Sequence, residues 1–73
     1  MIGPFYFTDF LGNEYKFSFD RRWIDIVRNK NFHSRVIQGK NILWSSYEDS
    51  IPLEARAYMD NVLQKLLKNK AFL

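Results

Sequence analysis

Two runs of alternating aromatic residues, separated by a turn sequence, constrain the fold more than any other feature of the chain. Aromatic side chains occupy every second position on both sides of the turn: Phe5, Phe7, Tyr15, Phe17 and Phe19. Alternation with a period of two is typical of β-strands that bury one face. The sequence therefore predicts a β-hairpin over residues 4–19.

The turn sequence Asp9–Gly12 predicts the register of this hairpin. Aspartate is favoured at the first position of a type I turn, where its carboxylate accepts hydrogen bonds from the backbone ahead, and glycine at the fourth. A type I turn followed by a glycine with positive φ forms a three-residue loop with a bulge. The expected cross-strand pairs are Asp9–Asn13, Phe7–Tyr15, Phe5–Phe17, Tyr6–Lys16 and Thr8–Glu14.

Phe10 and Leu11 occupy the two central positions of this turn, where polar residues are usual. Two explanations are open. The hairpin tip packs on the C-terminal helix, or it is an exposed apolar anchor for a partner. Exposed apolar clusters that are rimmed by polar groups often mark binding sites.

The segment after the hairpin is interpreted as a short helix over about residues 21–30. Asp20 is a suitable N-cap, and Trp23, Ile24 and Val27 fall on one helical face. The alternative is a strand, because this stretch is rich in β-branched residues and alternates in part. We favour the helix, followed by a polar loop that contains Asn29, Asn31, His33 and Ser34.

Residues 35–44, RVIQGKNILW, predict a second hairpin. Val36 and Ile37 would face Ile42 and Leu43 across a type II′ turn, for which a glycine at position 39 is suitable. The alternative is that the preceding helix continues to residue 38 and ends at this glycine.

The C-terminal part of the chain predicts an amphipathic helix over about residues 52–70. Apolar residues recur there at helical spacing: Ala55, Tyr58, Met59, Val62, Leu63, Leu66 and Leu67. Asp49 or Ser50 is the expected cap, with Pro52 and Glu54 in the first turn. Positive charge near the end suits the helix dipole and comes from Lys65, Lys68 and Lys70. An apolar tail, residues 71–73, follows.

Together these elements predict one α+β domain over residues 1–73, in the order ββα(ββ)α, with two layers. An antiparallel hairpin sheet is covered by the long C-terminal amphipathic helix. The opening hairpin and the helix expected after it resemble the start of a β-grasp, or ubiquitin-like, domain over roughly the first 30 residues. This resemblance implies a fold and no function, and the long terminal helix departs from it.

Catalytic and metal-binding motifs are not recognisable in this sequence. The chain has no cysteine and one histidine, its carboxylates are dispersed, and it lacks a nucleophile elbow and a phosphate loop. We therefore expect a protein that is not an enzyme, with no metal, no cofactor and no small-molecule substrate. No run of about 20 apolar residues and no signal peptide is present, so we expect a cytoplasmic protein without a membrane partner.

The leading functional hypothesis is a small protein-binding module of the regulator or inhibitor type, which occupies the surface of a partner. Seven phenylalanines, four tyrosines and two tryptophans exceed what a 73-residue core needs. The partner is an unidentified protein or a second copy of the chain as a homodimer. The expected contact residues are Phe10, Leu11, Tyr6 and Lys16.

The alternative hypothesis is a small basic regulator that binds nucleic acid. The net charge is +3, and basic residues interleaved with Trp23 and Phe32 are concentrated between residues 21 and 40. Such a mixture suits phosphate neutralisation and base stacking. The residues concerned are Arg21, Arg22, Arg28, Lys30, Arg35 and Lys40.

Overall fold

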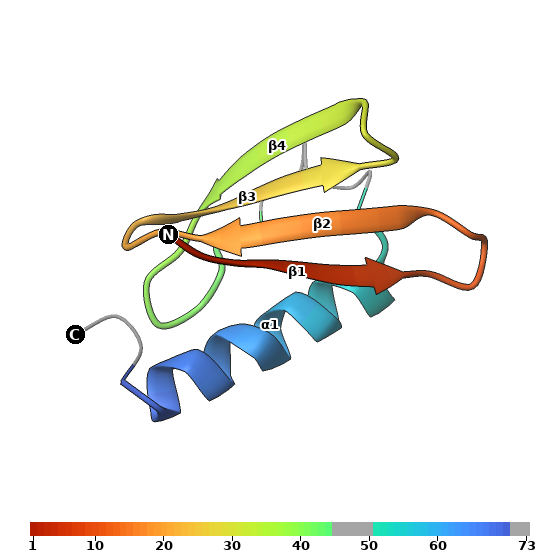
Figure 1. Ribbon diagram of the computed structural model, residues 1–73. Coiled ribbons are helices and arrows are strands. Elements are labelled where there is room, and N and C mark those ends of the chain that lie inside the picture. Colours follow the sequence, from red (N-terminus) through yellow and green to blue (C-terminus); the bar gives the residue numbers. More distant parts are fainter. Residues whose placement is uncertain (45–50, 71–73) are drawn as a thin grey trace.

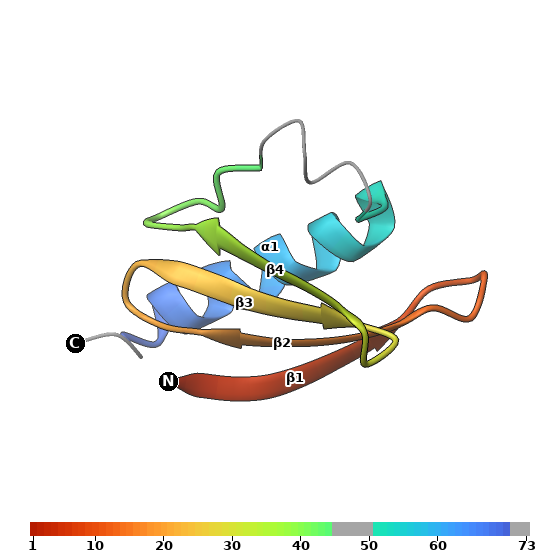
Figure 2. The same ribbon diagram turned by 90° about the horizontal axis from the view of Figure 1, so that it is seen from above.

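The computed structural model describes residues 1–44 and 51–70. Four strands, β1 (Ile2–Thr8), β2 (Glu14–Phe19), β3 (Trp23–Arg28) and β4 (Phe32–Ile37), form an antiparallel meander in the order β1-β2-β3-β4. One helix, α1 (Leu53–Lys68), follows and lies against one face of the sheet (Figures 1 and 2). The order is thus ββββα, and the predicted order ββα(ββ)α is wrong in its middle part.

The first hairpin has the predicted register. Four of the expected pairs, from Phe5–Phe17 to Thr8–Glu14, are partners in the β1–β2 ladder. At the fifth, Asp9 N donates to Asn13 O at 3.0 Å. Gly12 N donates to Asp9 O at 3.0 Å, and Gly12 has a φ of 88°, as the predicted type I turn with a left-handed glycine requires.

The segment predicted as a helix over residues 21–30 is strand β3. Its side chains alternate, so that Ile24 and Ile26 are buried and pair with the β2 residues Phe19 and Phe17. Pairing with β2 buries these β-branched residues more completely than one face of a short helix would. Asp20 is consequently not a helix cap, and its carboxylate accepts from the neighbouring Arg21 N at 2.7 Å in the β2–β3 turn. The resemblance to a β-grasp domain ends with the hairpin.

The predicted polar loop is only a short turn. Asn29 and Lys30 have φ values of 51° and 67°, as in the type I′ turns that join adjacent antiparallel strands. His33 and Ser34, which were expected in the loop, lie within β4. These two residues belong to a strand because every residue of β4 pairs with a residue of β3.

The reversal predicted within residues 35–44 occurs, but it does not form a second paired hairpin. Val36 and Ile37 complete β4 and pair with β3. The chain then turns back with one isolated bridge, Gln38–Ile42, and Leu43 N donates to Ile37 O at 2.9 Å. The alternative, in which a helix ends at position 39, is wrong because no helix precedes it.

The C-terminal helix is confirmed to within two residues at each end. Pro52 is its N-cap residue and provides no side-chain hydrogen bond, while Glu54, Lys65 and Lys68 carry the expected charges at the two ends. The expected caps and the apolar tail, residues 49–50 and 71–73, lie outside the described residues. No helix in residues 1–44 and 51–70 is long and apolar enough to cross a membrane.

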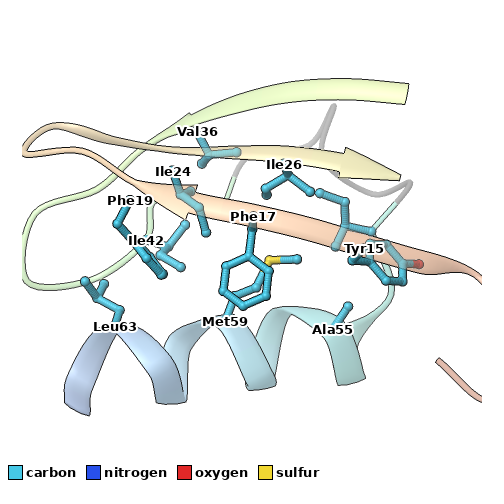
Figure 3. Close-up of a cluster of buried hydrophobic side chains, with 11 residues drawn as sticks. Tyr15, Phe17, Phe19, Ile24, Ile26, Val36, Ile42, Ala55, Met59 and Leu63 are labelled. Atoms are coloured by element: carbon cyan, nitrogen blue, oxygen red, sulfur yellow. The ribbon is translucent and has the colours of Figure 1, made fainter. Parts of the chain in front are cut away.

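One hydrophobic core lies between α1 and the sheet (Figure 3). The helix contributes three fully buried side chains, Ala55, Met59 and Leu63. They pack against aromatic and β-branched residues of the inner sheet face and its connections, namely Tyr15, Phe17, Phe19, Ile24, Ile26, Val36, Ile42 and Ile51. The opposite sheet face carries no other element of the described chain (Figure 2).

Candidate functional site

The hairpin tip is held by the carboxylate of Asp9, which is 5% exposed. Its Oδ1 accepts from Leu11 N at 3.0 Å and from Asn13 N at 2.9 Å. Its Oδ2 accepts from Asn13 Nδ2 at 3.0 Å and from the Tyr15 hydroxyl at 2.9 Å. The backbone of the turn is therefore fixed by one side chain below it.

The protonation states of Asp9 and Tyr15 suit the hydrogen bond between them. Burial raises the pKa of Asp9, but the hydrogen bonds from Asn13, Tyr15 and Leu11 favour the ionised form and bring the pKa below its usual value. Burial, reinforced by the Asp9 carboxylate, raises the pKa of Tyr15 to about 12. At neutral pH the carboxylate accepts hydrogen bonds and the phenol donates one.

The two turn residues above Asp9 project their side chains into solvent. Phe10 is 85% exposed and Leu11 is 75% exposed. Phe10 N donates to Glu54 Oε1 at 3.4 Å, so the backbone of the tip contacts the first turn of α1. The tip thus reaches the helix, as one explanation required, while both apolar side chains stay outside the core, as the other required.

A second turn supports the base of the tip. Asn29, in the β3–β4 turn, donates from Nδ2 to Asn13 Oδ1 at 2.9 Å and accepts from Glu14 N at 2.8 Å. Two exposed carboxylates lie beside the tip, since Glu14 follows the turn along the chain and Glu54 Oε1 accepts from Phe10 N. The tip therefore combines two apolar side chains with an acidic border, although the chain as a whole is basic.

Tyr6 and Lys16, the other two predicted contact residues, do not lie at the tip. They pair with each other on the sheet face that α1 leaves uncovered, which we call the open face. A row of paired residues crosses all four strands there, since Lys16 pairs with Val27 and Val27 with His33. Tyr6 is 66% exposed at the start of this row. The four predicted residues are therefore divided between two surfaces.

The open face is hollowed along this row. A cavity of about 440 Å³ is lined by Tyr6, Glu14, Tyr15, Lys16, Val27, Lys30 and His33. A second hollow of about 390 Å³ shares Val27 and His33 with the first and continues towards Arg35. Together the two hollows span the sheet from its β1 edge to β4.

Arg35 closes the far end of the open face. Its Nε donates to Asp25 Oδ1 at 2.7 Å, and its guanidinium carbon lies 4.5 Å from the centroid of the Trp23 ring. The stacking and the ion pair hold Arg35 in one orientation across β3 and β4. The side chain of Trp23 is half-buried, so most of its ring is a packed part of the surface.

The six basic residues proposed for nucleic acid do not form one patch. Arg21 and Arg22 are in the β2–β3 turn, and Lys30 is in the β3–β4 turn at the opposite end of the strands. Arg28 lies over the Phe32 ring at 4.8 Å, on the side that faces the helix layer. Lys40 is beyond β4, where its carbonyl accepts from Gln64. Of the six, only Lys30 and Arg35 line the hollows of the open face.

His33 and Val27 are the residues of the open face that sequence reasoning missed, because one was assigned to a loop and the other to a helix. A period-two interpretation of residues 23–37 would have placed both on the same face. Leu53, which is 77% exposed beside Glu54, was also not anticipated. Within the described residues, no three histidine or acidic side chains form a cluster that could hold a metal ion.

No family model matches the chain, and neither curated proteins nor solved structures resemble it closely enough to count as matches. Function must therefore be argued from the geometry of the tip and of the open face.

Proposed function

We propose that the protein is a small, non-enzymatic binding module that inserts its hairpin tip into an apolar pocket of a partner protein. The observation that carries this proposal is the exposure of Phe10 and Leu11 on a turn whose backbone is already fixed by Asp9. A loop that is rigid before binding loses little conformational entropy when it binds. The exposed apolar side chains of the tip are therefore carried by a backbone that is ordered before binding, which favours their use as anchors.

The size of the two side chains supports an anchoring role. Full burial of a phenylalanine or leucine side chain contributes on the order of 1.5–3 kcal/mol each. Interface energy is usually concentrated in a few such residues, surrounded by contacts that contribute little. Phe10 and Leu11 would be the anchors, and the polar groups around them would form the rim.

The charges beside the tip define the kind of pocket. Glu14 and Glu54 are exposed next to it, whereas the Asp9 carboxylate is occupied within the turn. Complementary charges raise the rate and the specificity of association. The partner is therefore a protein with an apolar cleft bordered by lysine or arginine side chains, and the module acts by filling that cleft.

A site-specific photocrosslinker tests this proposal directly. Benzoylphenylalanine replaces Phe10 in one protein and Leu43 in a control, because Leu43 is 61% exposed elsewhere on the surface. Both proteins are irradiated in nuclease-treated lysate of the source cells. We expect a saturable crosslink to one protein from position 10 that is absent from position 43. Equal products from both positions, or a crosslink only to a second copy of the chain, would contradict the proposal.

Titration with the purified partner then tests the anchors. Phe10→Ser should weaken binding by about 10- to 150-fold, which corresponds to the loss of one buried aromatic side chain. Leu43→Ser, the matched control, should bind as the unmodified protein does. Reversal of Glu54 to lysine should slow association, and the effect should shrink as the salt concentration rises.

A further inference from the structure

The open face has a composition that differs from that of the tip. Its larger hollow follows the row Tyr6, Lys16, Val27 and His33 across the four strands, and Lys30 of the β3–β4 turn also lines it. An exposed aromatic ring next to cations is the combination that binds a planar base joined to a phosphate. The volume of about 440 Å³ lies within the range of small ligand sites.

We propose that the open face binds single-stranded nucleic acid, with one nucleotide in the larger hollow. The base stacks on Tyr6, and the adjoining phosphate is held by Lys16, Lys30 and His33. The two lysines outnumber the one carboxylate of the lining, Glu14, so the hollow favours an anion.

The second hollow extends the site along the strand. It shares Val27 and His33 with the first and leads to Arg35, which stacking on Trp23 and the bond to Asp25 hold in place. His33 and Arg35 are two residues apart on β4 and project from the same face. The next phosphate of an extended strand would follow this line from Lys30 towards Arg35.

A single strand fits this surface better than a duplex does. Unpaired bases can turn out and stack on aromatic side chains, whereas the bases of a duplex are stacked on one another. The open face is a sheet surface with Tyr6 on its edge strand β1, and α1, the helix of the described residues, lies on the other face and cannot enter a groove from this side. Polyglutamate would be attracted by the same lysines, but it has no ring that could stack on Tyr6.

Fluorescence anisotropy with labelled oligouridylate and oligothymidylate tests this inference on the full chain. We expect binding at low ionic strength that weakens as salt rises. Tyr6→Ala should weaken it by about 5- to 150-fold, the range for the loss of one base–aromatic stack. Lys16→Gln should lower the slope of the log–log salt dependence by about one. Lys68→Gln, an exposed lysine on α1, is the matched control and should change neither quantity.

Four outcomes would overturn the inference. The first three are the absence of binding at low salt, an unchanged affinity in Tyr6→Ala that retains the circular dichroism of the native protein, and equal binding of polyglutamate. Free uridine monophosphate tests whether the site binds a strand or only a single nucleotide. An affinity for uridine monophosphate equal to that for the oligonucleotide would also count against the inference. Phe10→Ser/Leu11→Ser should bind the oligonucleotide normally, so failure of this inference is distinguishable from failure of the tip as a protein anchor.

Discussion

The hydroxyl of Tyr15 donates to Oδ2 of Asp9 at 2.9 Å, and both residues are buried where the hairpin leaves the sheet. Tyr15 packs in the hydrophobic core, while Asp9 holds the backbone of the tip. This one bond therefore connects the core to the surface that we propose binds a partner. The geometry of the tip depends on the packing of the domain beneath it.

Tyr15→Phe should lower the free energy of unfolding by about 1–3 kcal/mol. The substitution keeps the ring in the core but removes the donor to a charged acceptor, and a hydrogen bond of this kind contributes about that much. Urea denaturation followed by circular dichroism measures the change. Tyr6→Phe, which alters an exposed hydroxyl, is the control and should stay within about 0.5 kcal/mol. Equal stabilities of the two variants would contradict a role for the Tyr15–Asp9 bond.

The burial of Tyr15, reinforced by its bond to Asp9, predicts a loss of stability in alkali. The pKa of Tyr15 is raised from 10.0 to about 12 in the folded protein, so its neutral form is the one that folding favours. This contribution is complete below pH 10 and is lost as the pH rises from 10 towards 12, where only the unfolded chain deprotonates at this residue. Thermal melts across this window should show a steeper decline for the unmodified protein than for Tyr15→Phe. Absorbance titration should also show one late tyrosinate transition, absent from that variant.

Asp60→Asn should raise stability slightly at neutral pH. Burial raises the pKa of Asp60, although a hydrogen bond from Trp44 Nε1 at 3.3 Å opposes this shift. Folding therefore disfavours the carboxylate, and an asparagine retains the acceptor without the charge. Because Asp60 is only partly buried, the gain should stay below about 1 kcal/mol.

The pH dependence gives the control for this prediction. A raised pKa means that the unmodified protein loses stability relative to Asp60→Asn as the pH rises through the acid range of the carboxylate. The difference in melting temperature should thus be present at pH 7 and disappear below pH 3.8, the ordinary pKa of this group. A constant difference at every pH would indicate a change in packing and not in charge.

Phe10→Ser/Leu11→Ser should leave stability unchanged to within about 0.5 kcal/mol per residue, as is usual for exposed positions. Both side chains are exposed, and the turn is held by the backbone and by Asp9. Met59→Ala, which truncates a fully buried side chain of α1, provides the contrast and should cost about 2–5 kcal/mol. A marked loss of stability in Phe10→Ser/Leu11→Ser would show that the side chains of the tip contribute to the stability of the fold.

The parts of the fold that could be predicted from the sequence are those determined by residues that lie close together along the chain. In the first hairpin, the chemistry of the turn and the aromatic alternation agree, and the whole register followed from them. The apolar face of α1 was predictable for the same reason, because Ala55, Met59 and Leu63 recur at helical spacing within one segment of the chain. Within residues 23–28 the same reasoning failed, since the apolar residues satisfy a helical and a strand pattern at once. Pairing of Ile24 with Phe19 and Val36 decided between the two, and no local pattern reveals it.

The candidate surfaces were predictable to different degrees for the same reason. Phe10 and Leu11 were conspicuous, because apolar residues at the centre of a turn are unusual. Their exposure depended on how the tip meets α1, which is a contact between residues 44 positions apart. The row from Tyr6 to His33 could not be recognised while β3 was interpreted as a helix and the first half of β4, including His33, as a loop. Its members come together only when four strands are aligned.

The way in which Asp9 holds the turn has a consequence for how such a chain can evolve. Its carboxylate serves the backbone amides of residues 11 and 13 and the side chains of Asn13 and Tyr15, and it makes no demand on the side chains at positions 10 and 11. Two codons can therefore vary while the domain beneath them stays as it is. A new dipeptide at the apex would give the same scaffold a new target, both for natural selection and for an engineer who grafts a recognition sequence there.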